Sequence, residues 1–77
     1  MQTNMNLVES SIIAAIGYDG LAKILHVQFK TGLTYLYFNV PINVYDEIFT
    51  APSQGSYFSK NIRGKYTYVF ESEVKHA

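Results

Sequence analysis

The chain has 77 residues, no cysteine, and six basic residues that balance six acidic ones. This length suits one domain, which buries only about 60% of its unfolded surface, so we expect a free energy of unfolding of a few kcal/mol. The absence of cysteine excludes a disulfide framework and a thiolate metal site. A polar N-terminus and short apolar stretches predict neither a signal peptide nor a membrane span, and indicate a soluble cytoplasmic protein.

The first half of the chain predicts a three-stranded antiparallel meander. Residues 12–18 form an apolar segment typical of a buried strand, and Asp19-Gly20 is a strong turn signal. Residues 23–30 alternate, with Leu25, Val27 and Phe29 on one face and mainly polar residues on the other. A turn at residues 30–32 then leads into a third strand at residues 33–39.

The second half predicts two short helices and a final strand. Pro41 suits the first position of a helix that ends near Ala51, because Pro52 follows. Ser53 suits the N-cap of a second helix, and Gly64 the C′ position that ends it. Residues 65–71 alternate like a strand. We therefore expect an α+β fold at residues 7–71, with flexible termini at residues 1–6 and 72–77, in which the helices are inserted before the last strand.

An ordered set of short motifs resembles a known family. The motifs are Val8-Glu9-Ser10-Ser11, Ile16-Gly17-Tyr18-Asp19, Leu25-x-Val27-x-Phe29, Gly32-x-x-Tyr35-x-Tyr37, Val40-Pro41-x-x-Val44-Tyr45 and Ala51-x-Ser53-x-Gly55-x-Tyr57-Phe58. Together they resemble the KTSC domain, which is named for its occurrence at the C-terminus of some lysyl-tRNA synthetases. The resemblance spans about residues 7–70 and implies a stand-alone copy of that domain. The synthetase context implies RNA binding as the function to test.

Tyr35 and Tyr37 lie two residues apart on one expected strand, so their side chains share a face of the sheet. If this face also carries His26 and Gln28, the tyrosines form an open platform for stacking on bases. If it carries Leu25 and its apolar neighbours, they belong to the core beneath the first helix. We favour the core interpretation, because an amphipathic helix follows immediately and needs a surface to cover.

A second candidate is the basic segment at residues 59–66. Lys60, Arg63 and Lys65 can neutralise phosphates, Asn61 can bind sugar or base edges, and Tyr66 can stack on an unpaired base. The alternative is structural, because cations at the C-terminal end of a helix stabilise its dipole without any ligand.

Catalysis has little support in the sequence. The two histidines are His26, on an expected solvated strand face, and His76, in the tail. Asp46 and Glu47 are adjacent on an expected helix, so their side chains diverge by about 100° and do not form a carboxylate pair. No cluster of metal ligands or glycine-rich phosphate loop is evident, and we expect neither enzyme activity, nor a metal, nor another cofactor.

The remaining class is a protein-interaction module. Seven tyrosines exceed what so small a core needs, and tyrosine is enriched at interfaces. The first or last strand can also offer an unpaired edge. Our leading hypothesis is a non-catalytic domain that binds tRNA or single-stranded RNA. The alternative is a domain that binds a protein partner or forms a homodimer through a tyrosine-rich surface.

Overall fold

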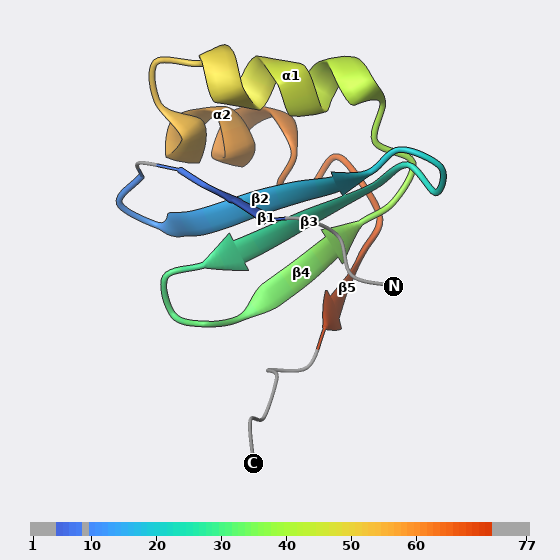
Figure 1. The fold of residues 1–77 in the computed structure, drawn as a ribbon, viewed down its shortest axis with the longest axis horizontal. Coiled ribbons are helices and arrows are strands. Elements are labelled where there is room, and N and C mark those ends of the chain that lie inside the picture. Colours follow the sequence, from blue (N-terminus) through green and yellow to red (C-terminus); the bar gives the residue numbers. More distant parts are fainter. Residues whose placement is uncertain (1–4, 9, 72–77) are drawn as a thin grey trace.

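The computed structural model describes residues 5–8 and 10–71, and shows one antiparallel sheet with two helices packed on one of its faces (Figure 1). The five strands lie side by side in the order in which they occur along the chain. The elements are β1 (Met5–Leu7), β2 (Ile13–Asp19), β3 (Ile24–Phe29), β4 (Thr34–Tyr37), α1 (Ile42–Thr50), α2 (Gln54–Asn61) and β5 (Tyr68–Glu71). The predicted α+β class is confirmed, and both helices lie between β4 and the last strand, as expected.

The sheet is larger than the predicted meander plus one strand, because it begins with β1. This strand pairs with β2, with Met5 opposite Gly17 and Asn6 opposite Ile16. Met5 and Asn6 therefore lie in the sheet and not in the N-terminal tail where we placed them; residues 1–4 and 72–77 lie outside the described residues. Three residues are too few to show an alternating pattern, so main-chain pairing and not sequence periodicity identifies β1.

The register of β3 and β4 decides which face carries the two tyrosines. Tyr35 lies opposite Val27, and Tyr37 lies opposite Leu25. Directly opposite residues of an antiparallel pair share a face. Both tyrosines therefore lie on the apolar face of the sheet, which the helices partly cover, and not on the face of His26 (Figure 1).

Proline residues set both ends of α1. Pro41 keeps an extended conformation (ψ 152°) and occupies the N-cap position, one residue before the helical position that we predicted for it. Ala51 is extended again (ψ 144°), because the ring of Pro52 disfavours helical geometry in the preceding residue. Between them, Ile48 is fully buried against the sheet.

The second helix begins as predicted and ends slightly earlier. The hydroxyl oxygen of Ser53 accepts a hydrogen bond from the backbone N–H of Ser56 at 3.2 Å, so the predicted N-cap is confirmed. The C-cap is Ile62, and Gly64 follows two residues later with a φ of 77°, a left-handed conformation that favours glycine. On the outer surface, the hydroxyl of Tyr57 donates a hydrogen bond to Glu47 at 2.6 Å and ties α2 to α1.

The core lies between the helices and the sheet. Its fully buried side chains come from β2, β3, α1, α2 and the segments beside the helices: Ile13, Ile16, Leu25, Val27, Val40, Ile48, Phe58 and Ile62. At one end, the hydroxyl of Tyr18 donates a hydrogen bond to the carbonyl of Val40, and its ring stacks on Tyr45 at a centroid distance of 5.1 Å. The N–H of Val40 donates in turn to the carbonyl of Lys23 at 3.0 Å, so the start of α1 is fixed to the β2–β3 turn.

Candidate binding site: an aromatic cleft

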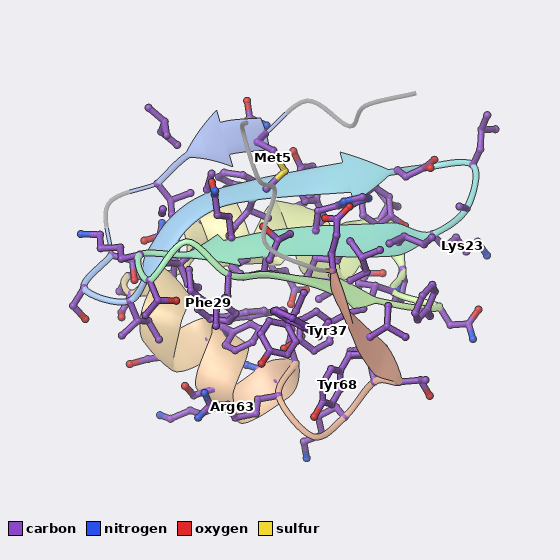
Figure 2. All side chains as sticks on the ribbon, turned by 90° about the horizontal axis from the view of Figure 1, so that it is seen from below. Met5, Lys23, Phe29, Tyr37, Arg63 and Tyr68 are labelled. Atoms are coloured by element: carbon purple, nitrogen blue, oxygen red, sulfur yellow. The ribbon has the colours of Figure 1, made fainter. Side chains whose placement is uncertain are left out.

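The helices leave part of the apolar sheet face uncovered beside β4 and β5. A cleft of about 520 Å³ lies there, which we call the aromatic cleft. It is lined by the β3–β4 hairpin, β4, the turn after α2 and β5, through Phe29, Thr31, Leu33, Tyr35, Tyr37, Arg63, Gly64 and Tyr68. Figure 2 shows Phe29, Tyr37, Arg63 and Tyr68 gathered on the same side of the sheet.

Tyr35 lies at the centre of the aromatic side chains. Its ring is 5.5 Å from those of Tyr68 and Phe70, measured between centroids, and 5.7 Å from that of Phe29, which it meets edge to face. The ring of Tyr37 lies 6.4 Å away and nearly parallel to it. Pairs with such geometry contribute about 0.5–1.5 kcal/mol beyond the burial of their area, so the rings hold one another in place.

Tyr37 forms the buried side of the cleft. Only 5% of its surface is exposed, and its ring meets Phe58 edge to face at 5.5 Å. Burial raises the pKa of the Tyr37 hydroxyl to about 12, although the positive charge of Arg63 opposes this effect. The hydroxyl is therefore neutral at physiological pH. Tyr37 cannot act as the open stacking platform considered above, whereas Tyr35 is only half-buried.

Arg63 places a positive charge beside these rings. It follows the C-cap of α2 and is exposed, yet its guanidinium carbon lies 5.9 Å from the centroid of the Phe58 ring. A guanidinium over an aromatic face at this distance is attracted by the ring quadrupole. The guanidinium is therefore held at the cleft, and no residue within 5–8 and 10–71 accepts a hydrogen bond from it, so its donors can reach a ligand.

The other residues of the predicted basic segment do not all join Arg63. Lys60 lines a separate groove between α2 and the segment before β2. Lys65 and Tyr66 line a shallow depression that shares Gly64 and Tyr68 with the aromatic cleft, so they border it. The side-chain amide of Asn61 donates to the carbonyl of Tyr57 within α2 at 3.2 Å.

The structure thus joins the two sites that the sequence suggested separately. Tyr35 and Tyr37 meet Arg63 in one cleft, and Tyr68 and Phe29 complete it. The sequence predicts Phe29 on the apolar face of its strand with Leu25 and Val27, and it does not place Tyr68 in a nucleic-acid site. The alternation of residues 66, 68 and 70 was the available signal for Tyr68, but it did not show which strand β5 would pair with.

Within residues 5–8 and 10–71, no group of three or more histidine or acidic side chains is placed to hold a metal ion. No helix in the same part of the chain is long and apolar enough to cross a membrane.

Comparisons with known proteins agree on one family. The family model of the KTSC domain matches residues 9–66. A lysine–tRNA ligase of Trichormus variabilis is 42% identical over 60 residues, which are 78% of this chain and 11% of the ligase. The chain thus spans about a tenth of the length of that enzyme. A protein of Tsukamurella paurometabola is 40% identical over 65 residues, and the match covers 97% of it.

A solved structure shows the same fold. The crystal structure of a KTSC domain protein from Yersinia pestis has a TM-score of 0.88 and 32% identity to this chain. The match covers 92% of this chain and the whole of the Yersinia chain.

Proposed function

This chain belongs to the KTSC domain family, and from this membership and the aromatic cleft we propose that it is a non-catalytic RNA-binding domain. The observation that carries the proposal is the position of Arg63, whose guanidinium lies beside a cleft lined by Tyr35 and Tyr68. The similarity to part of a lysine–tRNA ligase supports RNA as the ligand.

The chemistry of the cleft suits an unpaired nucleotide. A base can stack on the accessible parts of Tyr35 and Tyr68, and such stacking contributes about 1–3 kcal/mol per base. Arg63 can bind the adjoining phosphate through its fork of donors. A volume of about 520 Å³ is within the range of small-ligand pockets and is too small for a duplex, so we propose that single-stranded RNA or an unpaired tRNA segment binds here.

The cations should contribute unequally. Arg63 and Lys65 line or border the cleft, and Tyr66 lies beside Lys65, whereas Lys60 faces another groove. Two phosphate contacts predict a slope of about −1.4 for the logarithm of affinity against the logarithm of salt concentration. This slope is small, which is consistent with the formal net charge of zero of this chain.

An amide NMR titration with tRNA and with short single-stranded RNA at low salt tests the proposal. We expect shifts at Tyr35, Arg63 and Tyr68. Arg63→Gln should weaken binding, by roughly tenfold for one charged contact. Lys60→Gln removes the same charge at the separate groove and should leave the affinity almost unchanged. Equal weakening by both variants, or no shift around the cleft with either RNA, would refute the proposed site.

Binding of a protein partner is a second candidate function, and the exposure of β5 favours it. All four residues of β5 are exposed, which suits a protein interface. Binding of this kind depends on apolar contact and main-chain pairing, so it should be nearly independent of salt, unlike RNA binding.

A further inference from the structure

Strand β5 carries large apolar side chains that the fold leaves partly uncovered. Tyr68 is 53% exposed, Val69 46% and Phe70 50%. Within the described residues, β5 is the last strand of the sheet and pairs with β4 alone. An edge strand with apolar side chains on both faces can pair with a further strand.

The register shows which main-chain groups of β5 point outward. Phe38 lies one step beyond the pair Tyr37–Tyr68, and its N–H donates to the carbonyl of Thr67 at 2.8 Å. Hydrogen-bonded and non-hydrogen-bonded pairs alternate in an antiparallel ladder, so the main chain of Val69 also faces β4. The N–H and C=O groups of Tyr68 and Phe70 therefore point away from the sheet, toward the open edge.

We propose that β5 pairs antiparallel with β5 of a second copy of this chain, about a twofold axis at Val69. This register places Tyr68 of each copy opposite Phe70 of the other. In this register the outward N–H and C=O groups of Tyr68 and Phe70 in each copy all form hydrogen bonds, within two hydrogen-bonded pairs. The residues that lie opposite one another also share a face of the sheet. Val69 then lies opposite Val69 of the second copy in a non-hydrogen-bonded pair, where side chains approach most closely.

The side chains on the two faces of β5 suit this register. On the helix-bearing face, Phe70 of the second copy would lie beside Tyr68, which is itself 5.5 Å from Tyr35. The second copy would thus extend the row of aromatic rings that lines the cleft. Aromatic side chains that lie opposite one another stabilise an antiparallel sheet.

The area available predicts a weak dimer. An aromatic side chain presents about 150–250 Å², so two half-exposed rings and Val69 offer roughly 250 Å² per copy, or about 500 Å² for the pair. Stable interfaces bury about 1,200–2,000 Å², and smaller ones are transient. The formal net charge of zero means that two copies do not repel each other at long range. We therefore expect the dimer to appear only at high protein concentration.

Disulfide trapping tests the twofold axis directly, because the chain has no cysteine of its own. Opposite residues of a non-hydrogen-bonded pair have Cα atoms about 4.5 Å apart, which is within the range that a disulfide spans. Val69→Cys should therefore give a covalent dimer under mild oxidation. Leu7→Cys is the control, because Leu7 is 87% exposed and lies on β1, at the other edge. Cross-linking of Val69→Cys at least several times faster than that of Leu7→Cys would support the proposal, and equal rates would refute it.

A charge-pairing experiment gives an independent measurement. Val69→Lys and Val69→Glu each place like charges opposite one another in a homodimer, so each variant alone should sediment as a monomer at concentrations where the wild type associates. An equimolar mixture should associate again, because the opposite charges then meet across the axis. A wild-type chain that stays monomeric up to about 1 mM, or a mixture no heavier than its components, would overturn the inference.

Discussion

The largely buried side chain of Tyr37 predicts that the domain loses stability at alkaline pH. Burial raises the pKa of this group from 10.0 to about 12 in the folded state. Unfolding returns the hydroxyl to water and to its ordinary pKa. The folded state therefore holds the proton more tightly, and the resulting contribution is fully present below pH 10 and lost as the pH rises from 10 through 12.

A difference of two units between the folded and unfolded pKa values corresponds to at most about 2.7 kcal/mol, and solvent in the cleft that Tyr37 lines screens part of this contribution. That is a large share of the few kcal/mol expected for a domain of this size. Tyr37→Phe removes the titrating group and keeps the ring against Phe58, so it should abolish this part of the alkaline loss.

Urea unfolding followed by far-ultraviolet circular dichroism, from about pH 8 to pH 12, measures the effect. Tyr57 also has a pKa raised to about 12, chiefly by its hydrogen bond to Glu47, but this group is common to both proteins and cancels in the comparison. The free energy of unfolding of Tyr37→Phe, relative to wild type, should be constant well below pH 10 and rise by at most about 2.3 kcal/mol by pH 12, where half of the folded protein still holds the proton. A constant difference across the whole range would refute the reasoning.

Three further variants test the packing and the turns by urea unfolding at neutral pH. Phe58→Ala removes a fully buried ring and should cost about 3–5 kcal/mol, enough to leave the chain largely unfolded by circular dichroism. Ser53→Ala removes the N-cap bond of α2 and should cost about 1 kcal/mol, whereas Ser59→Ala on the exposed side of the same helix should change little; equal costs would contradict the capping role. Gly64→Ala meets no atom within 4 Å but forces a side chain into a φ of 77°, so it should cost about 1 kcal/mol from backbone strain alone. Gly20→Ala, also at a turn, should be nearly neutral, and a similar loss in both glycine variants would show that strain is not the cause.

The sequence predicted those parts of the fold that local pattern controls. The alternation of residues 23–30 gave the apolar face of β3, and Ser53 marked the start of α2. The pairing of β5 with β4 was harder to predict from the sequence, because two helices separate these strands along the chain. The contact of Tyr68 with Tyr35 therefore joins residues whose spacing along the chain carries no periodic signal.

The basic segment shows a second limit of sequence analysis. Lys60 and Arg63 are three residues apart and would be neighbours on a continuous helix. The helix ends between them, at the Ile62 cap, and the chain then turns. Lys60 therefore faces one groove and Arg63 another, which a count of cations along the sequence does not show.

The order of the strands in the sheet bears on how the domain forms. Each strand pairs with its neighbours in the chain, so β2, β3 and β4 can associate by closing short turns. The pairing of β4 with β5 closes a loop around both helices, and a longer loop costs more entropy. We therefore expect the hairpins to form early and β5 to join last, and hydrogen exchange should be faster at Val69 than at Val27.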